Sequence, residues 1–147
     1  MSTISMPKIN IIKVLEAVRP LERRLSMLLL AEHGMSVSQF RLLLPLLPDT
    51  GLTASQLCTT LGITKASGSI LIQELTRAGV VAVTPNPEDR RSIVIRLTPE
   101  GKNRMRAAET GIAALEKTLA RQIPDNTVKA LAHLTRLKFI TKKKTAS

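Results

Sequence analysis

Apolar residues recur at spacings of three and four near the start of the chain, and this period predicts an amphipathic helix over residues 9–33. The apolar positions include Ile11, Leu15, Val18, Leu25 and Leu29. Pro20 lies inside this stretch and is expected to kink or break the helix, because proline lacks a backbone N–H and its ring collides with the preceding turn. Gly34 is expected to end it.

Two capping-box sequences predict where the next helices begin. In Ser36–Gln39 and in Thr53–Gln56 a hydroxyl and an amide side chain are three residues apart, so each can satisfy a backbone N–H near the other. Pro45 is expected to end or bend the first helix early. Gly62 is expected to close the second in the left-handed conformation.

Gly62 would make a tight turn after the second helix. A third helix follows this turn, capped by Thr64 and running to Ala78. Residues 80–84 and 92–97 are then rich in Val and Ile and are separated by a turn that contains Pro and Asn, which indicates a hairpin. The order of helix, tight turn, helix and hairpin is typical of a winged helix-turn-helix, whose second helix can enter the major groove of DNA. We assign this unit to about residues 36–98.

Two more helices are predicted after the hairpin. Thr98 is a suitable cap for one that runs to about Arg121, and Pro124 precedes the last. The apolar helices at both ends lie outside the compact unit, so a twofold dimer that buries them is the economical arrangement. A monomer that folds these helices over one core is the alternative.

The predicted fold class is mainly α with a small β-hairpin wing. We expect a single domain over residues 1–147, with dimerisation helices at about 8–33 and 99–141 and a disordered tail at 142–147.

Composition narrows the choice of partner. The chain has 147 residues with 22 Lys+Arg against 11 Asp+Glu, a formal net charge of +11, which predicts a polyanionic partner such as double-stranded DNA. Solubility alone is the other explanation of the charge. No apolar run approaches the roughly 18 residues of a membrane span, and no secretion signal is visible. We therefore expect a cytoplasmic, nucleoid-associated protein with no membrane partner.

The third helix presents two different faces. Leu71, Ile72 and Leu75 are expected to pack on the preceding helix, whereas the opposite face carries polar residues about one turn apart. These polar residues are Lys65, Ser69, Gln73 and Arg77. Lysine and arginine can bind phosphate or guanine, and glutamine can bind adenine. An ordinary solvated face is the alternative.

Two positions of this helix stand out. Gly68 either permits a close backbone approach or loosens the helix. Ile70 either packs on a thymine methyl or weakens the grip on DNA.

The hairpin carries Arg90 and Arg91 beside Asp89. Arginine on a narrow hairpin can insert into the minor groove, and Asp89 is expected to hold Arg91 or the turn backbone. A surface ion pair is the alternative. The predicted DNA-binding residues are Ser55, Thr64, Lys65, Ala66, Ser67, Ser69, Ile70, Gln73, Arg77, Asp89, Arg90, Arg91 and Ser92.

Two segments resemble the MarR family of bacterial transcriptional regulators. Residues 89–101 read Asp-Arg-Arg-Ser-Ile-Val-Ile-Arg-Leu-Thr-Pro-Glu-Gly, which is similar to that family's Asp-x-Arg, β-strand and Leu-Thr-x-x-Gly. Residues 75–81 resemble its pattern of leucine, three residues, glycine and two apolar residues. The resemblance covers nearly the whole chain but is specific only over 53–101.

The resemblance implies a homodimer that binds a pseudo-palindromic operator, usually as a repressor. It also implies release from DNA by a small aromatic or carboxylate effector beside the first, second and fifth helices, or by cysteine oxidation. Here the effector would meet Arg19, His33, Phe40 and Leu44. Ordinary surface and core roles are the alternative for these four. Cys58 is expected to be buried, and a buried apolar thiol is inert.

No enzyme motif is present. The two histidines are a hundred residues apart, one cysteine excludes a multi-cysteine zinc site, and no phosphate loop or nucleophile elbow occurs. We expect no catalysis, no cofactor and no metal. The competing function is a winged-helix protein-interaction module, whose binding would depend much less on salt.

Overall fold

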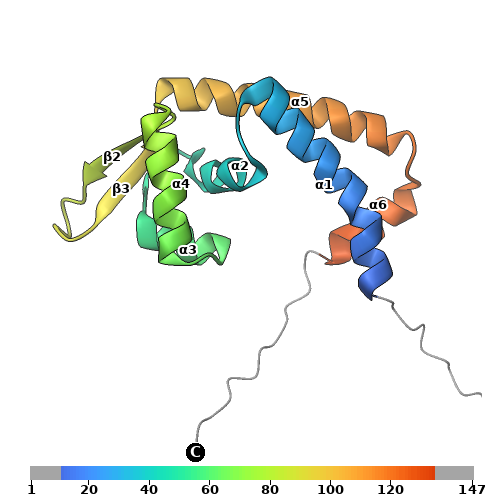
Figure 1. Cartoon of the computed structure of the whole chain (residues 1–147), viewed down its shortest axis with the longest axis horizontal. Helices are drawn as coiled ribbons and strands as arrows, with labels where there is room; N and C mark the ends of the chain where they lie inside the picture. The colour runs from blue at the N-terminus through green and yellow to red at the C-terminus, as the bar shows by residue number, and fades with distance from the viewer. Residues whose placement is uncertain (1–10, 135–147) are drawn as a thin grey trace, which may run out of the picture. The chain divides into compact units, whose positions relative to one another are not determined.

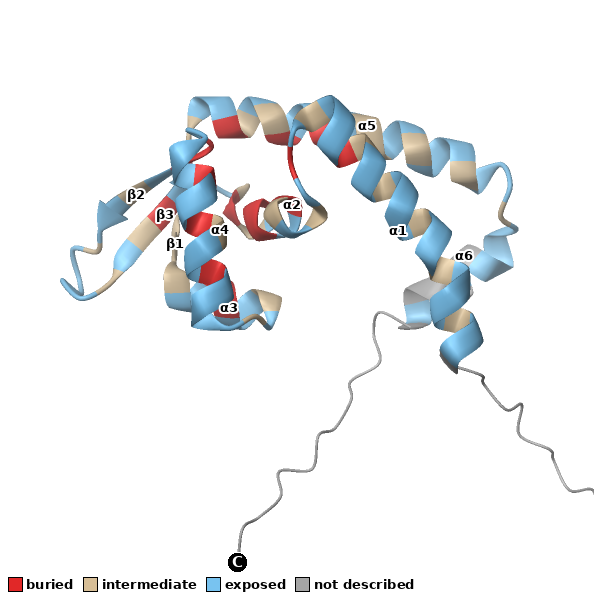
Figure 2. Cartoon of the chain, in the orientation of Figure 1, coloured by how far each residue is buried: buried red, intermediate tan, exposed pale blue. Residues whose placement is uncertain are grey.

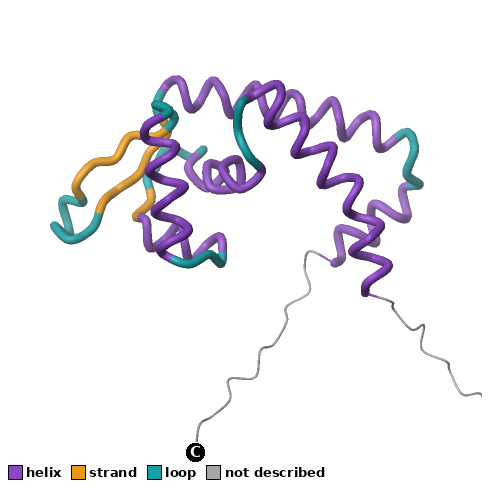
Figure 3. Tube along the Cα trace, in the orientation of Figure 1, coloured by secondary structure: helices purple, strands orange, loops and turns teal. Residues whose placement is uncertain are grey.

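Helices dominate the structure of the protein, a computed structural model that describes residues 11–134 (Figure 3). The predicted fold class is confirmed, with α3 and α4 as the helix-turn-helix and β2 and β3 as the wing (Figure 1). The elements in chain order are α1 (Ile11–His33), α2 (Val37–Leu43), the 3-10 helix η1 (Leu44–Leu46), β1 (Leu52–Thr53), α3 (Ala54–Leu61), α4 (Lys65–Arg77), β2 (Val81–Pro85), β3 (Ile93–Leu97), α5 (Pro99–Ala120) and α6 (Asp125–Leu134).

Both predicted capping boxes are present. Ser36 Oγ accepts from the Gln39 backbone N–H at 3.1 Å, and the Ser36 N–H donates to Gln39 Oε1 at 2.9 Å. Thr53 and Gln56 make the same reciprocal pair at 3.2 and 2.8 Å. Gly62, at φ 65°, then ends α3 in the left-handed conformation, as predicted. Local chemistry therefore sets both ends of the first helix of the helix-turn-helix.

The two prolines inside predicted helices behave differently. Pro45 lies in η1, so α2 ends at Leu43, as expected. Pro20 lies inside α1, which continues to His33, so the break considered for this position does not occur. Proline removes only one hydrogen bond of a 23-residue helix, and tertiary packing supplies most of a helix's stability.

The wing belongs to a three-stranded antiparallel sheet in the order β1-β3-β2. The central strand pairs on both sides, because Ile95 lies opposite Leu52 of β1 and opposite Val83 of β2. The predicted hairpin of β2 and β3 is confirmed, and the structure adds β1 to it as a third strand that was not predicted. This strand has only two residues, and its partner lies about forty residues later, so no local pattern marks it.

The strands also begin one residue later than predicted. Val80 is not in β2, because its N–H donates to Leu75 O at 2.9 Å and closes α4. Ser92 is not in β3, because its N–H donates to Asp89 O at 3.0 Å and closes the turn of the wing.

The core is aliphatic, as the composition requires, and Phe40 is the one aromatic residue within the described part. Figure 2 shows buried residues on α2 and along one side of α4. Ile72 and Leu75 of α4 are buried together with Leu57 of α3, and Leu71 packs at the edge of this cluster. The predicted core face of α4 is confirmed, which leaves the opposite face for solvent or a partner.

The chain forms two compact units, residues 1–112 and 113–147. The first contains the helix-turn-helix and wing within its described part, and the second contains α6. The predicted division of the chain stays a prediction, and residues 8–10, 135–141 and 142–147 of it lie outside the described residues. Within 11–134, no helix has both the length and the apolarity that crossing a bilayer requires.

Candidate nucleic-acid interface

A groove with a volume of about 880 Å³ lies between α4 and the wing. The α4 wall carries Lys65, Ser69, Gln73 and Arg77, and the wing wall carries Arg91 and Ser92. The four α4 residues follow one another at intervals of four, so each successive side chain lies one turn along the same wall. The structure therefore brings the predicted polar face of α4 and part of the predicted wing into one concave, basic surface.

The floor of this groove is mainly apolar. Ile72 of α4, Val83 of β2 and Ile93 of β3 line it, together with Ser55 and Cys58 of α3. Cys58 is only 6% exposed, which confirms the prediction of a buried thiol. The polar side chains of the two walls thus come from separate elements, with these apolar residues between them.

Thr64 caps the N-terminus of α4. Its Oγ1 accepts from the Ser67 N–H at 3.2 Å and donates to Ser67 Oγ at 3.0 Å. Thr64 and Ser67 are thus hydrogen-bonded to each other at the start of the helix. Ala66 and Ile70 are exposed on α4 but are not among the residues that line the groove.

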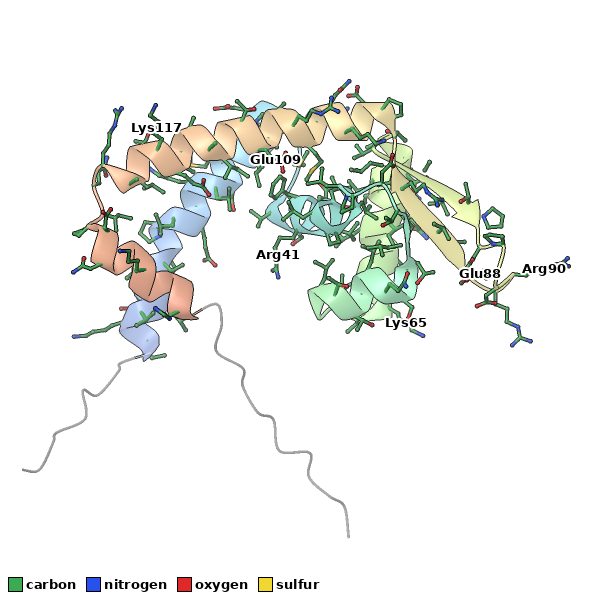
Figure 4. All side chains as sticks on the ribbon, turned by 180° about the vertical axis from the view of Figure 1, so that it is seen from behind. Arg41, Lys65, Glu88, Arg90, Glu109 and Lys117 are labelled. Atoms are coloured by element: carbon green, nitrogen blue, oxygen red, sulfur yellow. The ribbon has the colours of Figure 1, made fainter. Side chains whose placement is uncertain are left out.

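Asp89 organises the turn of the wing. Its Oδ1 accepts from the Arg91 backbone N–H at 3.0 Å, and its carbonyl accepts from the Ser92 hydroxyl at 3.2 Å. Asp89 was expected to hold either the Arg91 side chain or the turn backbone, and in the structure it holds the turn backbone. Arg90 extends from the tip of the wing into solvent (Figure 4).

Several other cations of the same unit already have partners in the chain. Lys102 forms an ion pair with Asp49 at 2.7 Å, and Arg104 forms one with Glu100 at 2.9 Å. Among the residues that the structure describes, neither ion pair includes Lys65, Arg77 or Arg91. The three groove cations are thus available to attract an external anion.

Six residues that line the groove were not among the predicted DNA-binding residues: Ala54, Cys58, Ile72, Thr76, Val83 and Ile93. Thr76 could have been found from helical spacing, since it lies three residues after Gln73 on the same side of α4. The two strand residues could not, because they reach the groove only when the wing folds beside α4.

A family model of the MarR family matches residues 33–92, from the end of α1 through the turn of the wing. The HTH-type transcriptional repressor YetL of Bacillus subtilis (strain 168) is 33% identical over an alignment of 110 residues, which covers 71% of this chain. The chain belongs to the MarR family. It spans 66% of the length of YetL, slightly less than two thirds.

Two solved structures of similar fold carry molecules that bear on a MarR-family site. MepR of S. aureus, solved in complex with DNA, has a TM-score of 0.73 and 20% identity, over 88% of this chain and 96% of that one. PcaV of Streptomyces coelicolor, solved with its natural ligand, has a TM-score of 0.71 and 19% identity, over 92% of this chain and 95% of that one. At these identities the likeness shows the shared fold.

The four effector residues implied by the MarR resemblance do not gather in one place within the chain. Phe40 is buried in the core, whereas Arg19 and Leu44 are exposed. Arg19 and His33 are fourteen residues apart on α1, or about 21 Å along its axis, too far for one small acid to touch both. Their role in effector binding stays a prediction.

His33 is the most suggestive of the four. Its Nε2 is buried and has no hydrogen-bond partner among the described residues. It faces α5, where a Cβ placed on Gly111 would lie 3.0 Å away. Buried polar atoms are usually satisfied, so this one marks a position where a donor or acceptor could be accommodated.

Metal binding has no support in the geometry of residues 11–134. No group of three or more His, Cys, Asp or Glu side chains gathers there at a spacing that could hold an ion.

Proposed function

We propose that this MarR-family protein is a sequence-specific transcriptional repressor that binds a pseudo-palindromic operator as a homodimer. The observation that carries the proposal is the groove between α4 and the wing, where Lys65, Arg77 and Arg91 line one concave surface. A helix in the major groove, with the wing on the neighbouring backbone or minor groove, would use both walls at once. The repressor YetL and the DNA complex of MepR support this choice of ligand.

Charge supports the same ligand. The net charge of +11 attracts a polyanion from a distance, and the groove cations are exposed and outside the described ion pairs. Each phosphate that such a cation neutralises releases counterions, which ties affinity to salt concentration. Gln73 adds a group that can bind adenine with two hydrogen bonds.

The proposed homodimer rests on α1. Ile12, Leu15, Met27 and Leu30 are between 60 and 70% exposed, and at about 100° per residue they fall within one third of the helix circumference. The four residues form an apolar pair at each end of this face, with Arg19 and Arg23 between the pairs, and such exposed apolar surface is unfavourable in water. In the proposed twofold dimer a second copy covers both pairs. The dimer would present two α4 helices to half-sites about one DNA turn apart.

Release by a small aromatic or carboxylate effector is part of the proposal. The unpartnered Nε2 of His33 supports a polar ligand beside α1 and α5, and the ligand complex of PcaV provides a precedent within the fold. In this proposal the protein acts in the cytoplasm, at the nucleoid.

A winged-helix protein-interaction module is the second candidate, favoured by one observation. Ile70 is 59% exposed near the centre of α4, and an exposed aliphatic side chain can anchor a protein partner. Such an interface would be far less sensitive to salt than a phosphate-binding one.

Selection from a random duplex pool by the full-length protein separates the two. We expect enrichment of a sequence with twofold symmetry, and a plot of log affinity against log salt with a slope of several units. Failure of any duplex to outcompete random DNA at physiological salt overturns the proposal, and so does an affinity that does not change with salt.

A further inference from the structure

Ala66 and Ile70 lie on the outermost side of α4. Taking about 100° per residue, both point away from Gly68, Ile72 and Leu75, the buried residues of this helix. They are one turn apart and both exposed, and Figure 2 shows that α4 has buried and exposed sides. The part of the helix that would reach deepest into a major groove is therefore apolar in its first two turns.

The neighbours of this pair are polar or charged. Lys65 precedes Ala66, and Ser69 and Gln73 lie beside Ile70 on the groove wall. An isoleucine and an alanine surrounded by such residues form a patch much smaller than the few hundred Å² typical of apolar docking surfaces. Two side chains of this size can instead cover one or two methyl groups of a base edge.

Methyl groups are a feature of the major groove that an apolar side chain can recognise. Thymine presents its C5-methyl there, whereas cytosine, guanine and adenine present only hydrogen-bonding groups or a bare C–H. Residues in the first turns of a recognition helix are the ones that contact base edges. Neither Ala66 nor Ile70 can satisfy the polar edge of guanine or cytosine, so these bases would be desolvated without compensation.

We propose that Ala66 and Ile70 form a methyl-reading pair that selects thymine in each operator half-site, with Ile70 making the larger contact. The inference rests on the proposed function and specifies which base the outermost side of α4 recognises. Polar readout then falls to the groove wall, through Gln73 and its neighbours.

The experiment uses the full-length protein and a duplex selected by it from a random pool. Each thymine is replaced in turn by deoxyuridine, which removes only the 5-methyl group. We expect one or two thymines per half-site at which uracil weakens binding about three- to tenfold, as the loss of one buried methyl contact implies. With Ile70→Ala, binding to the thymine duplex weakens by a similar factor, and the largest uracil penalty, at the thymine that Ile70 contacts, disappears.

Gln73→Ala is the matched control. It removes a polar reader from the same helix, so it should weaken binding and leave the uracil penalty unchanged. The inference is overturned if uracil is neutral at every position, or if every uracil penalty persists unchanged in Ile70→Ala. Both results would leave selective DNA binding intact, whereas failure to select any duplex would overturn the proposed function itself.

Discussion

Gly68 and Cys58 fit together across the turn of the helix-turn-helix. A Cβ built on Gly68 would collide with Cys58 Sγ, so only glycine allows α4 to approach α3 this closely. Both residues are buried. Of the two roles considered for Gly68, the structure has the close approach, and the sulfur atom occupies the space that a side chain at position 68 would otherwise fill.

The first prediction is that Gly68→Ala destabilises the protein. Alanine is favoured over glycine in a helix by about 1 kcal/mol, but the added methyl group overpacks a tight contact, at a cost of about 1–3 kcal/mol. We expect a net loss of about 1 kcal/mol, measured by urea denaturation of the full-length chain.

The same substitution in a Cys58→Ala background is its control. Without the sulfur atom the clash disappears, and Gly68→Ala should then stabilise the protein by up to about 1 kcal/mol. An equal effect in both backgrounds would show that the two residues are not coupled.

Thr98 and Gly101 give a physical reason for the motif at the start of α5. Thr98 Oγ1 donates to Gly79 O at 2.6 Å and accepts from the Gly101 N–H at 3.0 Å. A Cβ on Gly101 would collide with the backbone carbonyl of Val80. The Leu-Thr-x-x-Gly motif therefore joins the end of α4 to the beginning of α5. Gly101 is needed for this close contact, although glycine usually weakens a helix.

The second prediction follows from this junction. Gly101→Ala should destabilise the protein more than Gly68→Ala, because the obstacle is a backbone carbonyl that cannot change rotamer. We expect a loss of about 2 kcal/mol or more in urea denaturation. A loss below that of Gly68→Ala would mean that the Val80 backbone shifts easily.

The third prediction compares two substitutions of Asp89 that remove the same charge. Asp89→Asn keeps a side-chain oxygen for the Arg91 N–H, whereas Asp89→Ala does not. Losing that hydrogen bond loosens the wing by about 0.5–1.5 kcal/mol, so we expect operator affinity to fall several-fold in Asp89→Ala and to change little in Asp89→Asn. Equal affinities in a titration would show that only the charge of Asp89 matters.

The fourth prediction concerns Arg91 on the wall of the groove. Arg91→Ala should weaken operator binding by about 1–3 kcal/mol and, if the contact is to phosphate, reduce the salt slope by about 1. Arg106→Ala removes an equal charge from an exposed position on α5 and should have a much smaller effect. Identical losses in the two variants would indicate a general effect of charge.

Local signals predicted most of this fold, and contacts between distant segments account for what they missed. Helix ends are set by contacts over three or four residues, as at the capping boxes of Ser36 and Thr53 and at Gly62. The sequence alone was therefore sufficient to predict these helix ends. Strand β1, the contact of Gly68 with Cys58 and the junction at Gly101 all depend on residues from other elements. The residues of the α4 wall follow helical spacing, which is local, so they were predicted. The wing wall was predicted only in part, because Val83 and Ile93 reach the groove through contacts between distant segments.

The fifth prediction concerns the two exposed apolar pairs of α1, Ile12 with Leu15 and Met27 with Leu30. A charged residue in each pair should prevent a second copy from covering it, since an unpaired charge buried in an apolar interface is strongly unfavourable. We expect the double variant Leu15→Glu, Leu30→Glu to sediment as a monomer at micromolar concentration, where the parent chain sediments as a dimer. The matched control is Glu32→Lys, which alters the charge of an exposed residue on the opposite side of α1 and should leave the dimer intact. A parent chain that sediments as a monomer, or a double variant that stays dimeric, would remove α1 from the proposed interface.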